Sequence, residues 1–354
     1  MSNTFCRFLS NGLSLTRIRS DNIIAKPCCW YQGGVEFTTA DKVIPMFENL
    51  ENWPKGCAVC QQQENSGFHS FRQASFDIVE DVPHNKPVAL DFNVDYNCNA
   101  ACVTCNPSWS STWYKQYAQN SIAIHEINFK ITDDINNLID NIDYSEVRRI
   151  KFFGGEPLLG DTHLRALEKI PDPSLVSIWY TTNGSIQLND KLLKTWEKFK
   201  LVFVELSIDG IEEQFNYIRW PLTWNKISNN MFSMRNQVPN NVLFRVNHTL
   251  NPFNIYYYDR LENWFKENFN ANKCGDPVEI NIHPAWGDWG LTRTPASLRE
   301  QVYKKYGDSS LSNLLKDSQQ QSCNTIQQFI STWEPIRKNN WKTIFPEIVP
   351  FFNF

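Results

Sequence analysis

The sequence predicts an α/β protein whose central part is a partial (β/α)6 TIM-like barrel. Short strands rich in β-branched and aromatic residues alternate with helical stretches from residue 88 onward. Six such units occur before residue 285, and polar or glycine-rich residues follow several of the strands. Because eight units close a standard barrel, six units indicate an open one.

Each expected strand is bounded by Gly, Pro, Asn or Asp. The expected strands are Val88–Val94, Val147–Phe153, Leu175–Thr181, Leu201–Ile208, Val242–Leu250 and Val278–His283. The expected helices are Ser111–Gln119, Asp133–Ile142, Thr162–Ile170, Asp190–Phe199, Asn225–Gln237 and Tyr257–Phe269. Repeated units of this kind predict a parallel sheet with right-handed crossovers. In such a barrel the functional site lies at the C-terminal ends of the strands.

Changes in composition divide the chain into three expected parts. Residues 1–85 hold five of the ten cysteines and are expected to form a small auxiliary domain. The segment Asp77–Pro87 is polar, contains two prolines and is typical of a linker. Residues 86–290 are expected to form the barrel, and residues 291–354 a C-terminal helical extension.

The bulk composition is that of an ordinary globular protein, with 42% hydrophobic and 20% charged residues among 354. The net charge of −4 gives no strong nucleic-acid signal. We expect neither a signal peptide nor a membrane span, since the start lacks an apolar segment and no run of about 18 apolar residues occurs. Ten cysteines without an export signal favour metal ligands in a reducing cytoplasmic compartment.

The loop after the first expected strand carries three thiols. Cys98, Cys102 and Cys105 have the spacing C-x3-C-x2-C, with asparagines and a proline around them. Thiolates select zinc or iron–sulfur clusters. A closed zinc site uses four ligands, whereas three thiols leave one iron of a [4Fe-4S] cluster open to a small chelating molecule. The alternative is that the three cysteines are core residues at helical spacing.

A second group of thiols lies in residues 1–85. Cys57 and Cys60 form a C-x2-C knuckle, and Cys6 and Cys28 complete a set of four, with Cys29 as the alternative to Cys28. Four thiols predict a closed site for a second, auxiliary [4Fe-4S] cluster or for zinc. A redox dithiol is a further alternative, but this segment lacks the βαβ context that such a dithiol normally has.

Further candidate residues share a place at or just after a strand end. They are Gly154, Gly155, Glu156 and Pro157; Thr182 and Asn183; Ser207 and Asp209; and Asn247. Glycines let the backbone approach a ligand closely, and a carboxylate beside them suits an ammonium group. Ser207 and Asp209 alternate onto one face and suit ribose hydroxyls. Taken singly, each feature is also compatible with a simple turn, and their order along the strands is the specific signal.

Together these motifs resemble the radical S-adenosylmethionine (radical SAM) enzyme superfamily. The cysteine loop, the Gly-Gly-Glu element, the Thr-Asn-Gly turn and the Ser207/Asp209 strand end match its core over about residues 88–284. The N-terminal part resembles the subgroup with a "twitch" auxiliary-cluster domain, on the pattern Phe5-Cys6, Pro27-Cys28-Cys29, Cys57-x2-Cys60, Glu64 and Ser70-x-Arg72, and on the segment CNPSWSSTW at 105–113. In the peptide-modifying relatives this domain usually follows the core, whereas here it precedes it.

The resemblance implies a role for each matched residue. Cys98, Cys102 and Cys105 would bind three irons, and S-adenosyl-L-methionine would chelate the fourth. The residues implied to contact S-adenosylmethionine are Gly154, Gly155, Glu156 and Pro157 at its amino group, and Ser207 and Asp209 at its ribose, with Thr182, Asn183 and Asn247 nearby. The family often has an aromatic residue before the last cysteine. Here that residue is Thr104, whose backbone is expected to meet the adenine edge.

The resemblance also implies an activity. An electron donor such as flavodoxin or ferredoxin would reduce the cluster, S-adenosylmethionine would be cleaved, and the 5′-deoxyadenosyl radical would abstract a substrate hydrogen. The implied enzyme is of oxidoreductase or transferase type, and the implied substrate is a peptide or protein side chain. A nucleotide, sugar or other small molecule is the alternative substrate. A non-catalytic iron–sulfur or zinc scaffold is a third reading, and it would not need Glu156, Ser207 and Asp209.

Two features after the fourth strand leave alternatives open. Arg219 is a candidate partner for a substrate carboxylate, for the cofactor's carboxylate or for a surface salt bridge. Trp286 and Trp289 suit either the roof of a substrate pocket or the cover of an open barrel edge. The apolar chain end, residues 345–354, is expected to dock on the core.

Overall fold

The computed structural model describes residues 4–18, 22–47, 51–65, 69–78, 86–127, 129–316 and 319–354. Most of the expected linker Asp77–Pro87 lies outside these residues. The strands are β1 (Gly12–Arg17), β2 (Ile23–Lys26), β3 (Val35–Glu36), β4 (Ala89–Asn93), β5 (Arg149–Phe152), β6 (Ser177–Thr182), β7 (Leu201–Ser207), β8 (Val242–Leu250) and β9 (Glu279–Pro284).

The helices fall between these strands and after the last one. The α-helices are α1 (Arg7–Asn11), α2 (Ala40–Val43), α3 (Ala58–Asn65), α4 (Phe71–Ile78), α5 (Ser111–Gln119), α6 (Asp133–Asp140), α7 (Thr162–Leu167), α8 (Asp190–Trp196), α9 (Glu212–Ile218), α10 (Trp224–Gln237), α11 (Tyr258–Asn268), α12 (Ala296–Tyr306), α13 (Ser310–Lys316), α14 (Asn324–Arg337) and α15 (Trp341–Ile344). The 3₁₀ helices are η1 (Ile44–Met46), η2 (Lys55–Cys57), η3 (Pro157–Leu159), η4 (Pro173–Leu175), η5 (Ile255–Tyr257), η6 (Gly287–Trp289), η7 (Leu291–Arg293) and η8 (Pro346–Phe351).

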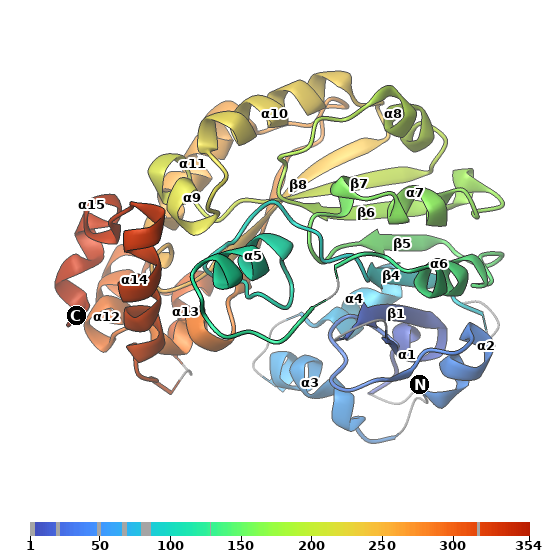
Figure 1. The fold of residues 1–354 in the computed structure, drawn as a ribbon, viewed down its shortest axis with the longest axis horizontal. Coiled ribbons are helices and arrows are strands. Elements are labelled where there is room, and N and C mark those ends of the chain that lie inside the picture. Colours follow the sequence, from blue (N-terminus) through green and yellow to red (C-terminus); the bar gives the residue numbers. More distant parts are fainter. Residues whose placement is uncertain are drawn as a thin grey trace.

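One open sheet organises the molecule (Figure 1). Its strand order is β3-β2-β1-β4-β5-β6-β7-β8-β9, with β3 and β9 at the two edges. Strands β1 and β4 to β9 run parallel to one another. Strand β2 pairs antiparallel with β1, and β3 pairs antiparallel with β2. The six predicted strands correspond to β4 to β9, so the predicted α/β class with an unclosed parallel sheet is confirmed.

The sequence did not predict the three N-terminal strands. Strand β1 lies parallel to β4, with Gly12 opposite Ala89 and Thr16 opposite Asn93. Strands β2 and β3 span only four and two residues, too few for a clear pattern. Strand β1 does alternate Leu13 and Leu15 with Ser14 and Thr16, a signal that the sequence analysis did not use. The N-terminal segment therefore extends the central sheet, and the division at residue 85 stays a prediction.

The two faces of the sheet differ in character. One face is apolar, with side chains such as Leu90, Ile150 and Val204 in a single buried cluster with the helices α6, α7, α8, α10 and α11. Successive side chains of a strand point to opposite faces. The other face accordingly carries polar residues at neighbouring register positions, such as Asp91 opposite Lys151 and Ser207 opposite Asn247.

The C-terminal extension packs against helices α5 and α9, which follow strands β4 and β7. Figure 1 shows α12 to α15 grouped together, on the side of the molecule away from the N-terminus. Phe345 and Ile348 are fully buried in a second apolar cluster that includes Tyr217 of α9. Trp333 of α14 meets Trp113 of α5 edge to face, with ring centroids 4.8 Å apart. The chain end thus docks on the core, as the sequence predicted.

Candidate functional site

The cysteine loop, residues 94–110, connects β4 to α5 and is fixed by its backbone on one side. Within it, the Ala101 amide donates to the Trp220 carbonyl at 2.6 Å, and the Val103 amide donates to the Ile218 carbonyl at 2.9 Å. Both partners belong to the end of α9 and the segment that follows it. The cysteine loop therefore lies against the loop region after β7, about 115 residues later in the chain.

The start of α5 fixes the other side of the cysteine loop. Ser110 caps the helix by accepting from the Trp113 amide at 3.3 Å, and its hydroxyl donates to the Ala100 carbonyl at 2.6 Å. Ser111 accepts from the Cys98 amide at 3.0 Å, and Thr112 donates to the Cys98 carbonyl at 2.6 Å. The Trp113 indole donates to the Cys102 carbonyl at 2.9 Å. The residues after Cys105 thus hold the loop that presents the thiols.

The Gly-Gly-Glu loop after β5 packs directly on the cysteine loop. The Gly155 amide donates to Asp95, and the Glu156 amide to the Asn97 carbonyl at 2.8 Å. A Cβ atom on Gly155 would lie 2.4 Å from the Asn97 carbonyl oxygen, and Gly154 has φ 126°. Both glycines are required by this close approach and this left-handed backbone.

The Glu156 carboxylate is fully buried and joins the ends of two strands, β5 and β6. It accepts from the Thr182 hydroxyl at 2.7 Å, the Asn183 amide at 2.7 Å and the Leu158 amide at 3.2 Å. Burial raises its pKa to about 7. The Asn183 side chain then donates to Asn99 of the cysteine loop at 2.8 Å. The sequence-predicted residues Gly154, Gly155, Glu156, Thr182 and Asn183 are therefore brought together beside the thiols.

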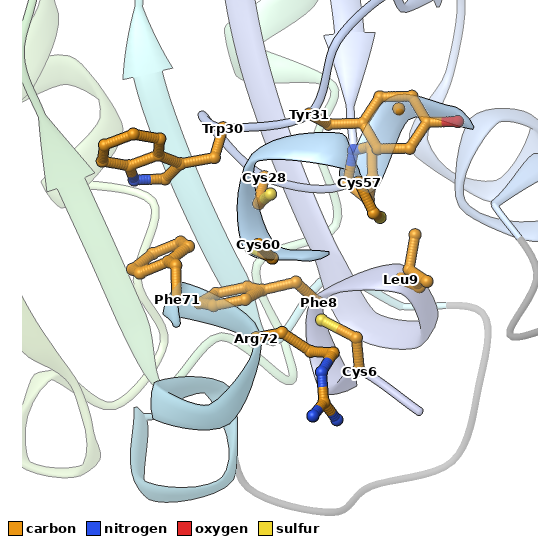
Figure 2. A pocket seen from close by; sticks show the side chains of 12 residues that line it. Cys6, Phe8, Leu9, Cys28, Trp30, Tyr31, Cys57, Cys60, Phe71 and Arg72 are labelled. Atoms are coloured by element: carbon orange, nitrogen blue, oxygen red, sulfur yellow. The ribbon is translucent and has the colours of Figure 1, made fainter. Parts of the chain in front are cut away.

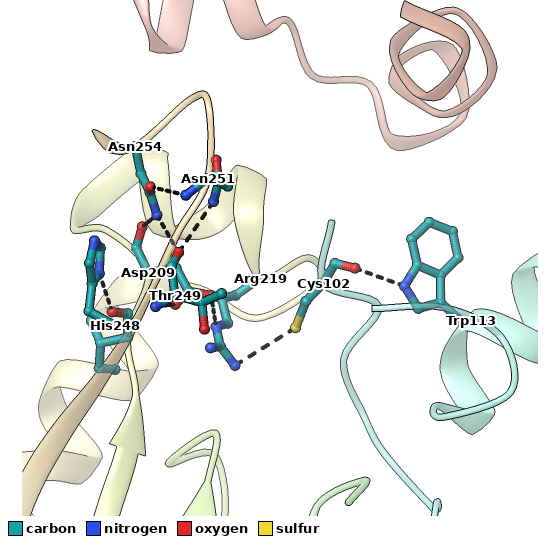
Figure 3. A network of polar contacts seen from close by, with 9 residues as sticks. Cys102, Trp113, Asp209, Arg219, His248, Thr249, Asn251 and Asn254 are labelled. Atoms are coloured by element: carbon teal, nitrogen blue, oxygen red, sulfur yellow. Dashed lines mark hydrogen bonds and ion pairs between the residues drawn. The ribbon is translucent and has the colours of Figure 1, made fainter. Parts of the chain in front are cut away.

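Asp209 and Arg219 form a buried ion pair next to Cys102 (Figure 3). The Arg219 Nε lies 2.7 Å from Asp209 Oδ2, and Asp209 Oδ1 accepts from the Thr249 amide at 2.8 Å. Arg219 Nη1 is 3.9 Å from the Cys102 Sγ. Arg219 thus forms a salt bridge, but a buried one with a carboxylate of the chain itself and not the surface salt bridge that the sequence left open. Its pairing with a substrate or cofactor carboxylate stays a prediction.

Ser207 and Asn247 lie opposite each other on the polar face of the sheet. The Asn247 amide donates to Glu205 at 3.1 Å, and Glu205 also accepts from Thr181 at 2.7 Å. Lys151 pairs with the same carboxylate at 2.8 Å. Sequence reasoning missed Glu205, Lys151 and Thr181. The available signal was a charged residue inside an otherwise apolar parallel strand.

The remaining predicted residues of this site are Thr104 and Pro157. Thr104 is half-buried in the turn between Cys102 and Cys105, and Pro157 is buried and opens η3 directly after Glu156. Of the two tryptophans named above, Trp289 is buried against Phe253, with ring centroids 5.2 Å apart, and Trp286 is 65% exposed.

The donor set of the cysteine loop suits a thiolate-ligated cluster, although the sulfur atoms do not stand in ligating positions. Burial raises the pKa of all three thiols, to about 12 for Cys105, and the Cys102 charge raises the pKa of Cys98 and Cys105 further. Within the described residues no three Cys, His, Asp or Glu side chains are arranged to hold a metal ion. Thiolates are soft ligands that suit iron–sulfur clusters. For all three to bind one cluster, the cysteine side chains must rotate toward a common centre.

The N-terminal thiols line a small apolar pocket (Figure 2). Cys6, Cys28, Cys57 and Cys60 all contribute to its wall. Cys29 does not line the pocket. Burial and then the negative charge of Asp91, which lies on the polar face of the sheet opposite Lys151, raise the pKa of its thiol to about 12. The structure therefore groups Cys28, and not Cys29, with the other three thiols.

Arg72, held in place by Glu64, lines this pocket. Arg72 pairs with both oxygens of Glu64, with Nε–Oε1 at 2.8 Å and Nη2–Oε2 at 2.6 Å, and Ser70 also donates to Glu64. Arg72 Nη1 donates to the Phe5 carbonyl at 2.8 Å. A bidentate arginine of this kind fixes geometry as well as charge. It ties the residue before Cys6 to the helices that carry Cys57, Cys60 and Arg72 itself.

Comparisons with known proteins give limited similarity. No family model matches the chain, and no curated protein matches it. The solved structure "Native anSMEcpe with bound AdoMet" is 17% identical, with a TM-score of 0.40, covering 62% of this chain and 59% of that one. "Native anSMEcpe with bound AdoMet and Kp18Cys peptide" is 15% identical, with a TM-score of 0.38, covering 62% of this chain and 60% of that one.

The matched region thus spans less than two thirds of each of those solved chains. At this identity and TM-score, neither the activity nor the ligands of those proteins transfer to this chain. Separately, no helix within the described residues has the length and apolar character needed to cross a bilayer.

Proposed function

We propose that the chain is a radical SAM enzyme. The single observation that carries the proposal is the joining of three separate motifs at one edge of the sheet. The Cys98–Cys105 loop, the Gly154–Glu156 loop and the Thr182–Asn183 turn are linked by direct hydrogen bonds at 2.7 to 3.0 Å. Such convergence at the C-terminal strand ends is where α/β sheets place their sites.

Under this proposal Cys98, Cys102 and Cys105 would hold a [4Fe-4S] cluster, and Gly154–Glu156 would bind the amino group of S-adenosylmethionine. When bound, the cluster would supply one electron, taken from a flavodoxin- or ferredoxin-like donor, for reductive cleavage of the C5′–S bond of S-adenosylmethionine, and the resulting carbon radical would take a substrate hydrogen. The chain's own residues orient and enclose these groups. The Glu156 carboxylate fixes the strand-end turn, and Asp209 holds Arg219 beside Cys102.

The N-terminal pocket supports a second, auxiliary cluster in this proposal. We assign Cys6, Cys28, Cys57 and Cys60 as its ligands, because these four thiols share one pocket and Cys29 faces elsewhere. Four protein ligands leave no open iron. The auxiliary cluster would therefore serve electron transfer or structure and would not chelate substrate.

The proposed substrate class is a peptide or protein side chain. It rests on the resemblance of the N-terminal cysteine pattern to twitch-containing enzymes.

The test is anaerobic reconstitution followed by incubation with reductant and S-adenosylmethionine. The proposal expects about eight irons per chain, from two cubane clusters, and release of 5′-deoxyadenosine. Cys102→Ala should abolish that release, whereas Cys274→Ala, at an exposed cysteine, should leave it unchanged. Zinc in place of iron, or undiminished cleavage by Cys102→Ala, would show the assignment to be wrong.

A second pair of variants tests which of the adjacent residues Cys28 and Cys29 is a cluster ligand. Cys28→Ala should remove about four irons, while Cys29→Ala should retain the full iron content. The reverse result would exchange the two ligand assignments without touching the assignment of the Cys98–Cys105 loop.

A further inference from the structure

The C-terminal extension places a positive charge behind the cysteine loop. Arg337, at the end of α14, is 8% exposed. Its guanidinium carbon lies 4.4 Å from the ring centroid of Trp113, 4.9 Å from that of Trp220 and 5.2 Å from that of Phe329. Rings at these distances attract a cation through their negative faces.

Arg337 also contacts the cysteine loop and α5 directly. Its Nη2 donates to the Ala101 carbonyl at 3.0 Å and to the Gln116 side chain at 3.1 Å. Ala101 immediately precedes Cys102. Burial lowers the pKa of Arg337 to about 10, and negative charge at Tyr217 and then at Cys102 opposes that shift. The side chain is therefore positively charged at neutral pH.

Within the described residues no carboxylate forms an ion pair with Arg337. Nearby Arg219 differs in this respect, because Asp209 balances its charge at 2.7 Å. A buried charge without a counter-charge is costly, and carbonyl and aromatic contacts offset only part of that cost. Cys102 is among the groups whose negative charge raises the pKa of Arg337, so a thiolate at Cys102 is close enough to compensate the guanidinium.

We propose that Arg337 is a positioning residue whose charge compensates the thiolates of the cysteine loop and thereby raises the reduction potential of the cluster they hold. The inference rests on the proposed function, since it needs a cluster on Cys98, Cys102 and Cys105. Adding one electron makes such a cluster more negative, and a nearby buried cation stabilises the more negative state. The C-terminal extension is then part of the redox centre and not only a cover.

A structural role alone predicts different behaviour from a charge role. If Arg337 only filled space between Trp113, Trp220 and Phe329, any residue of similar bulk would serve and the potential would not move. If its charge matters, a charged replacement should preserve the potential and a neutral replacement of similar length should not. The pair Arg337→Lys and Arg337→Gln separates the two cases.

A matched control is Arg235 of α10. It too lies over an aromatic ring, 4.6 Å from the Phe269 centroid, and donates to a backbone carbonyl, that of Ala271 at 3.3 Å. It contacts no part of the cysteine loop in the described structure. Arg235→Gln should leave the cluster's potential unchanged.

The experiment is a potentiometric titration of the reconstituted full chain, followed by electron paramagnetic resonance, with iron content measured on the same samples. Arg337→Gln should hold about tenfold less reduced over oxidised cluster at a fixed donor potential, a downward shift of about 59 mV for a one-electron couple. Arg337→Lys and Arg235→Gln should match the wild type. Should Arg337→Gln not fold, Arg337→Met provides the neutral comparison.

The outcomes distinguish the two proposals. If the wild type takes up no iron at Cys98–Cys105, the proposed function fails and the inference fails with it. If the wild type cleaves S-adenosylmethionine but the neutral variants keep its potential, only the inference is overturned. Equal shifts in Arg337→Lys and Arg337→Gln would likewise refute a charge role.

Discussion

Glu156 has its carboxylate committed to the fold. All three of its recorded hydrogen bonds come from the chain itself, from Thr182, Asn183 and Leu158. If this segment binds the amino group of S-adenosylmethionine, Glu156 would hold the loop in place, and the backbone of Gly154 and Gly155 would supply part of the contact. The residue acts first as the joint between the loop after β5 and the turn after β6.

The pKa of Glu156 leads to a pH prediction. Burial raises it from 4.5 to about 7, so the folded state holds a proton that the unfolded state has already lost between these two values. Stability should therefore be greatest below the unfolded value, fall by about 3 kcal/mol as pH rises through this window and level off above it. Urea unfolding of the cluster-free protein between about pH 4 and about pH 8 measures this.

Glu156→Gln provides the comparison, because its side chain does not titrate. As pH rises, the unfolding free energy of the wild type should fall relative to that of Glu156→Gln. A difference that stays constant with pH would show that Glu156 does not change protonation between folded and unfolded states in this range.

At the scale of single elements, the start of α5 connects helix stability to the geometry of the thiols. Ser110 is both the N-cap of the helix and a donor to Ala100 within the cysteine loop. Sequence alone suggested a serine-rich helix start. Its second use, as a support for the cysteine loop, depends on the loop folding back over the helix end.

Ser110→Ala should cost about 1 kcal/mol from the lost cap and should also lower the iron retained after reconstitution. Thr132→Ala is the matched variant, because Thr132 caps α6 through the Ile135 amide at 3.3 Å and lies in a different part of the chain. It should lose similar stability while keeping full iron. Chemical unfolding and iron analysis measure both effects. Equal iron content in the two variants would exclude a support role for Ser110.

At the scale of the whole molecule, the N-terminal segment and the barrel share one sheet. Strand β1 covers the edge of β4 over five residue pairs, from Gly12 with Ala89 to Thr16 with Asn93. Leu13 and Leu15 are buried in the same cluster as Leu90 and Phe92. The auxiliary thiols and the thiols of the cysteine loop are consequently carried by one continuous sheet.

Expression of residues 86–354 alone tests how independent the barrel is. We expect this fragment to aggregate, because removal of β1 leaves β4 as an unprotected edge and exposes apolar side chains. The soluble fraction and the cooperativity of unfolding, compared with the full chain, measure the effect. A soluble fragment with a single cooperative transition would instead support the sequence-based boundary at residue 85.

Sequence reasoning located the regular part of the fold well and the irregular part poorly. The β4 to β9 strands and helices such as α5 have strong periodic patterns, which local side-chain spacing determines. Strands β2 and β3 and helix α9 were missed because short elements carry little period of their own, whereas β1 was missed although its leucines alternate with polar residues. Glu205 and Lys151 were missed because their importance arises from pairing across strands.

By itself, the sequence determined which chemistry the chain can offer. It specified two sets of thiols, the glycines that permit close approach, and a parallel sheet whose strand ends carry polar groups. Only the tertiary structure decided which of these residues meet. It grouped Cys28 rather than Cys29 with the N-terminal thiols, paired Asp209 with Arg219, and placed Arg337 behind Cys102 from 235 positions along the chain. The physical reason is that residue type and spacing act locally, whereas burial, ion pairing and charge compensation depend on segments brought together by folding.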